Sequence, residues 1–155
     1  MNIRLIAGEY GGRQIARPPG NRTHPMGERI RGSLFNMLGD LSGKTVPDAF
    51  AGSGALGLEA LSRGATHATF IEQDKVAARI IDENISTLSA RDKASIICAS
   101  VAGWDETTKD ASYDIIFADP PYHNLQLSTV ARLVKYLKPN GLMVLSIPGR
   151  ESVPT

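Results

Sequence analysis

The sequence predicts an α/β domain built around a doubly wound, mostly parallel sheet. From Lys44 onward, short runs rich in β-branched and aromatic residues alternate with amphipathic segments of helical length. A glycine-rich loop follows the first of these runs, and an acidic residue ends the next. Strands that alternate with helices favour a parallel sheet with helices on its faces. The length of 155 residues suits a single domain of this kind.

Residues 1–40 are predicted to form a small extension on this core, a β-hairpin followed by a helix. Residues 3–7 and 13–17 read as two strands around a glycine-containing turn, with arginines on one face and aliphatic residues on the other. The stretch Pro18-Pro19-Gly20-Asn21 ends the hairpin, and residues 23–26 read as a further extended or turn segment. We expect this extension to pack on the core and not to fold separately.

The helix of the extension is predicted from about Gly27 to Leu38. Its apolar stripe consists of Ile30, Leu34, Met37 and Leu38. Arg29 and Arg31 are expected to project from the other faces of the helix, where they would be available to a ligand.

Five core strands are expected further along the chain, at residues 45–50, 68–72, 94–99, 114–118 and 142–147. Helices are expected over residues 55–63, from Asp74 to about residue 88, and over residues 125–138. Glycine favours the position after a helix and aspartate caps a helix N-terminus, so Gly64 and Asp74 suit the ends of the first two. Pro139-Asn140-Gly141 is expected to close the last helix.

A glycine loop stands at the first strand-to-helix turn, where Gly52, Gly54 and Gly57 form the pattern Gly-x-Gly-x-x-Gly. Glycines at such a turn let a ligand approach the backbone beside a helix N-terminus. Glu72 ends the next strand, where an acid accepts hydrogen bonds from the ribose hydroxyls of a nucleoside cofactor. The alternative for Glu72 is a solvated strand end.

Two cofactors fit this loop, NAD and S-adenosylmethionine. A pyrophosphate favours neutral or positive surroundings, but Asp48 precedes the glycines and Asp119 is expected at the neighbouring strand end. Two carboxylates would repel a pyrophosphate and attract the ammonium and sulfonium groups of S-adenosylmethionine. The charge pattern therefore favours S-adenosylmethionine.

The candidate catalytic stretch is Asp119-Pro120-Pro121-Tyr122, which follows a predicted strand. In open α/β sheets, ligands bind beyond the carboxyl ends of the strands. A carboxylate accepts hydrogen bonds from an amino group, and consecutive prolines make a stiff loop whose carbonyls are free to accept. The ring of Tyr122 can stack on a planar base. The alternative is a loop that only closes the strand, with Tyr122 as a lid on the core.

Basic residues are concentrated at the N-terminus. Residues 1–38 carry six arginines against two acidic residues, whereas the remaining 117 residues carry 11 basic and 14 acidic side chains. Because the guanidinium fork suits phosphate, this asymmetry points to a polyanionic partner, nucleic acid, and composition alone leaves a merely solvated polar surface as an equal alternative. The candidate nucleic-acid-binding residues are Arg4, Arg13, Arg17, Arg22, Arg29 and Arg31.

Composition disfavours several other classes of protein. No apolar run reaches the length of a membrane span and nothing at the N-terminus reads as a signal peptide, so we expect a cytoplasmic protein. The single Cys98 lies in an apolar run, which predicts a buried structural thiol in a reducing compartment. Three scattered histidines form no legible metal site. We expect a monomer.

Three further stretches carry a resemblance to a known family. They are Ile6-Ala7-Gly8-Glu9-Tyr10-Gly11-Gly12-Arg13, Glu28-Arg29-Ile30-Arg31 with Leu34-Phe35-Asn36, and Asp48-Ala49-Phe50-Ala51-Gly52-Ser53-Gly54-Ala55-Leu56-Gly57-Leu58-Glu59-Ala60. With the Asp-Pro-Pro-Tyr stretch, they make the chain similar to class I S-adenosylmethionine-dependent amino-methyltransferases, and more narrowly to the bacterial RsmD family. That family methylates the exocyclic N2 of one guanine in small-subunit ribosomal RNA. The likeness runs from about Ile3 to Ile147.

The resemblance implies a Rossmann-like class I methyltransferase fold, S-adenosylmethionine as cofactor, and small-subunit ribosomal RNA or an assembling ribosomal subunit as partner. Residues 1–40 would be a basic RNA-binding extension and residues 41–155 the cofactor-binding core. By position, Glu72 would hold the ribose, Ser100 and Val101 would flank the adenine, and the N-terminal arginines would grip RNA phosphates. The implied cofactor-binding residues are Asp48, Ala49, Gly52, Gly54, Glu72, Ser100, Val101 and Asp119.

The chain departs from the family pattern in two places. Ala99-Ser100 stands where relatives usually have an aspartate beside the adenine, so weaker cofactor binding is expected. Relatives continue past the fifth strand with another helix and a final β-hairpin, whereas this chain stops at Thr155. A core without those elements would expose an apolar edge beside the fifth strand.

The mechanism implied is methyl transfer to an exocyclic base nitrogen. Asp119 and the carbonyl of Pro120 would accept the two N–H bonds of the amino group and align its lone pair. The base must be unstacked, so single-stranded or loop RNA, or a flipped base, is expected. Three alternatives stay open: a DNA adenine-N6 methyltransferase, an NAD-dependent oxidoreductase and a catalytically silent RNA-binding domain.

Overall fold

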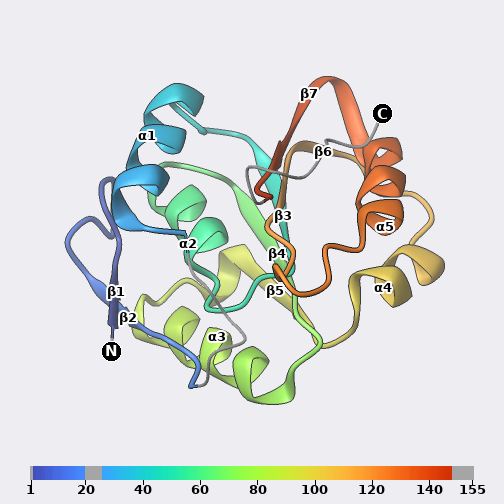
Figure 1. Cartoon of the computed structure of the whole chain (residues 1–155). Helices are drawn as coiled ribbons and strands as arrows, with labels where there is room; N and C mark the ends of the chain where they lie inside the picture. Colours follow the sequence, from blue (N-terminus) through green and yellow to red (C-terminus); the bar gives the residue numbers. More distant parts are fainter. Residues whose placement is uncertain (1, 20–25, 148–155) are drawn as a thin grey trace.

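A five-stranded parallel sheet forms the centre of the molecule (Figure 1). The computed structural model describes residues 2–19 and 26–147. The strands are β3 (Thr45–Ala49), β4 (His67–Ile71), β5 (Ala94–Ile97), β6 (Tyr113–Ala118) and β7 (Leu137–Leu145). They lie in the order β5-β4-β3-β6-β7, and all neighbouring pairs are parallel. The order reverses at β3, so the predicted doubly wound α/β fold is confirmed.

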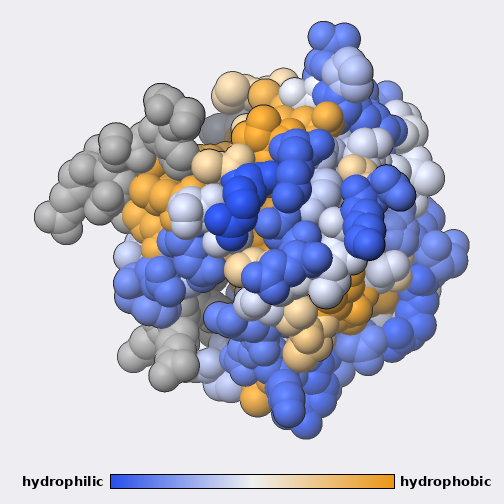
Figure 2. Space-filling view, turned by 90° about the vertical axis from the view of Figure 1, so that its right-hand side faces the viewer, coloured by the Kyte–Doolittle hydropathy of each residue, from blue (hydrophilic) through white to orange (hydrophobic). Residues whose placement is uncertain are grey.

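Helices cover both faces of this sheet (Figure 1). One face carries α1 (Glu28–Leu38), α2 (Ala55–Ser62) and α3 (Lys75–Thr87), and the other carries α4 (Val101–Thr107) and α5 (Leu127–Arg132). A larger hydrophobic core lies under α1, α2 and α3, and a smaller one lies on the opposite face. In the smaller core, the rings of Trp104 and Tyr136 pack with centroids 5.0 Å apart. Figure 2 shows this second side of the molecule as largely polar, with hydrophobic patches between.

The N-terminal hairpin shares the larger core. Its strands β1 (Asn2–Arg4) and β2 (Gln14–Ala16) pair antiparallel, as predicted. Alternation turns Ile3 inward and Arg4 outward in β1, and it turns Ile15 inward in β2, while Arg13, just before β2, is exposed. Because its aliphatic face is buried against the same side chains as α2 and α3, the extension is continuous with the domain.

The predicted apolar stripe of α1 is wrong at two positions. Ile30 and Met37 are 64% and 85% exposed, and the buried residues of the helix are Arg31 and Phe35. Phe35 packs its ring 5.5 Å from that of Phe117 in the sheet. Arg31 is turned inward because the buried carboxylate of Glu59, on α2, supplies its counter-charge.

The segment after β6 also differs from the prediction. The expected helix over residues 125–138 becomes α5, a 3-10 helix at Leu133–Tyr136, and the first residues of β7. Pro139-Asn140-Gly141 lies inside β7, where Asn140 adopts a φ of 67° and the register with β6 shifts. The three residues form a bulge in an edge strand, a position that tolerates proline.

Two further features were not predicted. Helix α4 is absent from the expected elements, although Ser100 caps it. Cys98 is exposed, not buried, because it follows β5, which lies at the edge of the sheet.

Of the helices within residues 2–19 and 26–147, none has the length and apolar character needed to cross a membrane.

A buried carboxylate, Asp105, joins α4 to the segment after α5. It accepts hydrogen bonds from Tyr136 Oη at 2.6 Å and from Arg132 Nε at 3.1 Å, and it lies 2.7 Å from Lys135 Nζ. Burial raises the pKa of Asp105, but the hydrogen bonds from Lys135, Tyr136 and Arg132 outweigh burial and hold the pKa at about 2. The ionised carboxylate therefore ties these elements together.

Asp105→Asn should lower the free energy of unfolding at pH 7 by about 1–2 kcal/mol, since three donors lose a charged acceptor. A lowered folded-state pKa gives a contribution that is present above the ordinary value of 3.8 and is lost as the pH falls toward 2. Urea unfolding should therefore show a smaller difference between wild type and variant at pH 3 than at pH 7. The exposed Asp110→Asn variant is the control, and an equal loss at both pH values would exclude a role for the charge.

Candidate active site

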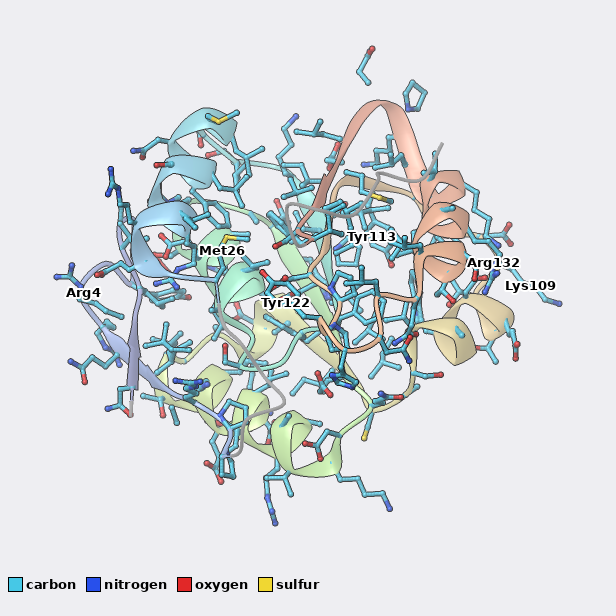
Figure 3. All side chains as sticks on the ribbon, in the orientation of Figure 1. Arg4, Met26, Lys109, Tyr113, Tyr122 and Arg132 are labelled. Carbon is cyan, nitrogen blue, oxygen red and sulfur yellow. The ribbon has the colours of Figure 1, made fainter. Side chains whose placement is uncertain are left out.

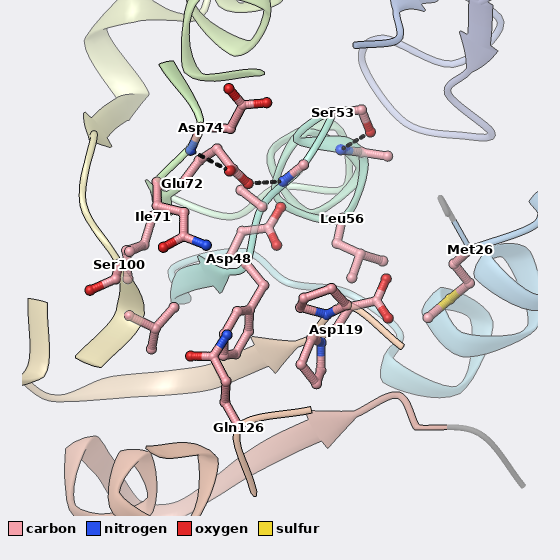
Figure 4. Close-up of a pocket in the computed structure, with 18 of the residues that line it drawn as sticks. Met26, Asp48, Ser53, Leu56, Ile71, Glu72, Asp74, Ser100, Asp119 and Gln126 are labelled. Atoms are coloured by element: carbon pink, nitrogen blue, oxygen red, sulfur yellow. Dashed lines mark hydrogen bonds between the residues drawn. The ribbon is translucent and has the colours of Figure 1, made fainter. Parts of the chain in front are cut away.

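A pocket of about 410 Å³ opens at the carboxyl ends of the strands, where the strand order reverses (Figure 4). This is the position at which open α/β sheets bind ligands. Side chains from the end of β3, the end of β4, the start of α4 and the loop after β6 meet here. The sequence-predicted residues that line it are Asp48, Gly52, Glu72, Ser100, Val101, Asp119, Pro120, Pro121, Tyr122, Arg17 and Arg31.

The glycine loop forms one wall of the pocket through an unusual backbone path. Phe50, Gly52 and Gly54 have φ values of 59°, 59° and 83°. The left-handed region is open to glycine but strained for phenylalanine, by about 1–3 kcal/mol. Gly57, on α2, is needed for packing, since a Cβ there would lie 2.4 Å from Cε1 of Phe70. The glycines thus bend the loop and bring α2 close to β4.

Asp48 lies beneath this loop at the end of β3. It is 1% exposed, and its Oδ2 accepts a hydrogen bond from Gly57 N at 2.9 Å. Burial raises the pKa of Asp48 well above its ordinary value, and the nearby charges of Asp119 and Glu72 raise it further. A cation in the pocket would relieve this desolvation and repulsion.

Glu72 fixes the glycine loop to the segment before α3. Its Oε1 accepts from Gly52 N and its Oε2 accepts from Asp74 N, both at 2.8 Å (Figure 4). Burial raises the pKa of Glu72, while these backbone donors oppose the rise. Each carboxylate oxygen keeps acceptor capacity for a further donor from a ligand.

Ser100 and Val101 lie where β5 passes into α4. The hydroxyl of Ser100 accepts a hydrogen bond from Gly103 N at 3.0 Å and so caps the helix. Val101 is buried in the smaller core and lines the pocket with its remaining surface. Ser100 therefore caps α4 without adding a further acid to the pocket.

The stretch Asp119-Pro120-Pro121-Tyr122 forms the wall opposite the glycine loop. Burial raises the pKa of Asp119 to about 6, partly offset by a hydrogen bond with Ser146. Pro120 is buried, whereas Tyr122 is 52% exposed at the mouth of the pocket, where Met26 also lies (both labelled in Figure 3). A partly desolvated carboxylate thus lies below an exposed aromatic ring.

Two of the predicted cofactor-binding residues do not line the pocket. Ala49 is 1% exposed and packs in the smaller core, because its side chain alternates away from the pocket face. Gly54 is the N-cap of α2 and faces Phe70 and Ile81. Both residues shape the loop without contacting the cavity.

Several lining residues were missed by sequence reasoning. Phe50 and Gln126 both adopt a left-handed conformation, with φ values of 59° and 50°, which residue type did not signal. The remaining missed residues come from the glycine loop, from α2, from β4 and the loop after it, from the loops after β5 and β6, and from the segment before α1. The missed lining residues are Met26, Phe50, Ala51, Ser53, Ala55, Leu56, Ile71, Gln73, Asp74, Ala99, His123 and Gln126.

The predicted nucleic-acid-binding arginines have four different outcomes. Arg4, Arg13 and Arg29 are exposed, and Arg4 lies at the outer side of the hairpin (Figure 3). Arg17 reaches the pocket, and Arg22 lies outside the described residues. The prediction that Arg31 projects outward is wrong. It is 1% exposed and donates to the carbonyls of Met26 and Arg4.

Two acids of the pocket, Asp48 and Glu72, accept hydrogen bonds from the protein backbone. Among the residues that the structure describes, no group of three or more His, Cys, Asp or Glu is arranged to hold a metal ion. Asp48 and Glu72 instead bond to backbone amides of the loops around them.

The fold and the pocket together define a class I methyltransferase, in which a glycine loop and an Asp-Pro-Pro-Tyr stretch face each other across the ends of a parallel sheet. The family model described as Conserved hypothetical protein 95 matches residues 3–155. The chain belongs to this family, the RsmD family of S-adenosylmethionine-dependent methyltransferases.

Curated relatives agree with this assignment. The chain is 36% identical over 147 residues to ribosomal RNA small subunit methyltransferase D of Haemophilus influenzae, covering 91% of this chain and 76% of that protein. It is 36% identical over 134 residues to the Escherichia coli K12 protein of the same name, covering 86% of this chain and 67% of that protein.

Solved structures show the same fold. A hypothetical protein of Thermus thermophilus aligns with a TM-score of 0.84 at 29% identity, over 98% of this chain and 90% of that one. The Escherichia coli protein yhhF, described as a methyltransferase, aligns with a TM-score of 0.82 at 33% identity, over 99% and 86% of the two chains. SMU.776, solved in complex with SAH, aligns with a TM-score of 0.66 at 22% identity, over 77% and 34%. At that identity the likeness shows the fold alone.

Proposed function

We propose that this chain methylates an exocyclic amino group of small-subunit ribosomal RNA, most specifically guanine N2, with S-adenosylmethionine as methyl donor. One observation carries the proposal: the Asp119-Pro120-Pro121-Tyr122 stretch lines the same cavity as Asp48 and Glu72. An acceptor wall and a cofactor wall therefore face each other within about 410 Å³. The names of the curated relatives support ribosomal RNA as the substrate class.

The pocket fits a cationic nucleoside cofactor. The spare acceptor capacity of Glu72 suits the hydroxyl groups of a ribose, and the cap of α4 at Ser100 borders the same space. Asp48 is buried with a raised pKa, so a neighbouring positive charge would stabilise its ionised form. When bound, S-adenosylmethionine supplies an activated methyl group.

The residues of the acceptor wall have complementary roles. An ionised Asp119 and the carbonyl of Pro120 accept the two N–H bonds of the base, which orients the nitrogen lone pair. Pro120 and Pro121 have a fixed φ, so the loop is stiff and the positions of its carbonyl groups are restrained when the base enters. Tyr122 offers an aromatic face to a base that has left its stack.

The exposed arginines of the extension would attract the RNA phosphates to the side of the molecule where this wall lies. Arg4 and Arg13 lie on the hairpin, Arg29 lies on α1, and Arg17 borders the pocket. Guanidinium groups bind phosphates through paired hydrogen bonds. We therefore propose residues 1–40 as the RNA-binding part of the domain.

Adenine N6 is the second candidate acceptor, because it presents the same amino geometry to Asp119. One relative, the tRNA1(Val) (adenine(37)-N6)-methyltransferase of Shewanella halifaxensis, is 33% identical over 79 residues, which is 51% of this chain and 32% of that protein. The longer coverage of the ribosomal RNA relatives favours ribosomal RNA as the substrate, and guanine N2 is the acceptor that the family resemblance implies.

The test is to map the modified nucleotide by mass spectrometry after reaction with unmodified ribosomal RNA, ribosomal subunits and duplex DNA. We expect one N2-methylguanine in small-subunit RNA and no product in DNA. Methyladenine in RNA would retain the enzyme class and overturn the guanine assignment. RNA binding with no cofactor affinity by calorimetry would overturn the proposed activity altogether.

Tyr122→Ala should weaken productive RNA binding, raising KM for RNA by about 5- to 150-fold, the range given by 1–3 kcal/mol of base–aromatic stacking. Tyr122→Phe retains the ring and should remain close to wild type. Steady-state kinetics at saturating cofactor would separate the two variants. Equal losses in both would assign the effect to the hydroxyl group, against stacking.

A further inference from the structure

Asn84 of α3 forms a buried polar bridge between the N-terminal hairpin and the glycine loop. Its Oδ1 accepts from Ala16 N at 2.8 Å, and its Nδ2 donates to Ala16 O at 2.9 Å and to Ser53 O at 3.3 Å. The side chain is 3% exposed. One amide group therefore holds the end of β2 against the loop between β3 and α2.

The two partners of Asn84, Ala16 and Ser53, either line the pocket or lie next to a residue that does. Ser53 lines the pocket, and so does Arg17, the residue after Ala16. Ser53 lies between Gly52 and Gly54, which gives the loop backbone unusual freedom. A hydrogen bond from outside the loop restrains the Ser53 carbonyl and, with it, the peptide groups on either side.

This restraint reaches the groups that would hold the cofactor. Gly52 N, in the residue before Ser53, donates to Glu72 at 2.8 Å. If the loop shifts, the orientation of Glu72 and the shape of the cavity wall shift with it. Asn84 lies behind the wall and does not line the pocket, so its action is indirect.

We infer that Asn84 is a positioning residue that couples RNA binding on the hairpin to cofactor binding at the glycine loop. The inference rests on the proposed function. A phosphate bound by the hairpin arginines restrains β2, and through Asn84 this restraint reduces the freedom of the loop. Each ligand then meets a partly ordered site, which makes the two binding events cooperative. By linkage, RNA tightens cofactor binding and the cofactor tightens RNA binding by the same factor.

Ser62 provides a matched control. It too ties the hairpin to a core helix, since its Oγ accepts from Tyr10 N at 2.9 Å and donates to Ala7 O. It is buried at the last residue of α2, at the opposite end of that helix from the glycine loop. Ser62→Ala therefore loosens the hairpin without removing a hydrogen bond to Ser53.

The experiment is calorimetry of SAH binding to wild type, Asn84→Ala and Ser62→Ala, each with and without unmodified small-subunit ribosomal RNA. In wild type, RNA should lower the Kd for SAH by about three- to tenfold, the effect of roughly one hydrogen bond. Asn84→Ala should bind SAH about three- to tenfold more weakly and lose the response to RNA. Ser62→Ala should retain both the affinity and the response.

A second measurement covers the case in which Asn84→Ala does not fold. Hydrogen exchange of wild-type residues 50–57 should slow when RNA is added without cofactor. SAH binding that is insensitive to RNA, with no change in exchange, would overturn the coupling and leave the proposed function intact. The same loss in Ser62→Ala as in Asn84→Ala would assign the effect to hairpin docking and also overturn it. Wild type that binds no SAH would overturn both proposals.

Discussion

Asp119→Asn should abolish most methyl transfer and at the same time stabilise the folded chain at neutral pH. The amide keeps the size of the carboxylate but replaces one acceptor oxygen with a donor, which faces the amino group of the base. Losing one preorganised hydrogen-bonding group in an active site costs about 10²- to 10³-fold in turnover. The measurement is single-turnover methylation with SAH binding confirmed on the same sample.

The stabilising effect follows from the pKa of Asp119. Burial raises it to about 6 from 3.8, so ionisation above pH 6 costs folding free energy, and this cost disappears as the pH falls toward 3.8. Asp119→Asn should therefore gain about 1–2 kcal/mol at pH 7, after allowance for solvent screening, and almost nothing at pH 4. The exposed Asp110→Asn variant should gain nothing at either pH.

The same pKa predicts the pH dependence of the wild-type reaction. Protonation of Asp119 below pH about 6 replaces an acceptor with a donor, so the rate should fall about tenfold per pH unit there. Full turnover by folded Asp119→Asn with bound cofactor would remove Asp119 from the mechanism. An unchanged stability at pH 7 would show that the carboxylate is well solvated.

Glu59→Gln should have the largest effect on stability. Glu59, on α2, is 0% exposed and accepts from Ile6 N at 2.9 Å, Ala7 N at 3.2 Å and Arg63 Nε at 2.9 Å. Its Oε1 lies 3.7 Å from Nε of the buried Arg31. Removing the charge leaves Arg31 without its counter-ion, and breaking such a buried pair costs about 3–5 kcal/mol. Urea unfolding followed by circular dichroism would measure the loss.

Glu28→Gln is the matched control for this variant. Glu28 also pairs with an N-terminal arginine, Arg4, at 2.6 Å, but both side chains are about half exposed. Exposed ion pairs contribute little, so this variant should unfold almost as wild type does. The double variant Arg31→Met with Glu59→Gln should recover part of the loss, because the uncompensated charge is gone. No recovery would assign the loss to the backbone hydrogen bonds of Ile6 and Ala7.

Local patterns were sufficient for much of the fold and one half of the site. Gly64 ends α2 and Asp74 caps α3 as predicted, because both depend on neighbours within one turn. The placement of Glu72 beside the glycine loop follows from the spacing of a βαβ unit, which the sequence displays directly. Asp119 follows β6 for the same reason.

Long-range partners explain where the predictions failed. Arg31 looks like a surface arginine until Glu59, 28 residues later, is placed beside it. Cys98 looks buried within its apolar run, but β5 has a neighbour on one side only. Phe50 occupies a backbone region that residue type disfavours, so composition pointed away from it. Each of these positions is decided by contacts between distant parts of the chain.

The hairpin's contacts also bear on the order in which the chain can fold as it is synthesised. Ile6 bonds to Glu59 over a separation of 53 residues, and Ala16 bonds to Asn84 over 68. At a synthesis rate of about 5–20 residues per second, Asn84 leaves the ribosome roughly 3–14 s after its partner Ala16. During that interval the core that Ile3 and Ile15 enter is incomplete, so chaperones that shield apolar nascent segments have time to bind this part of the chain. A chain whose first strands are also its proposed RNA-binding surface completes that surface only after α3 has emerged.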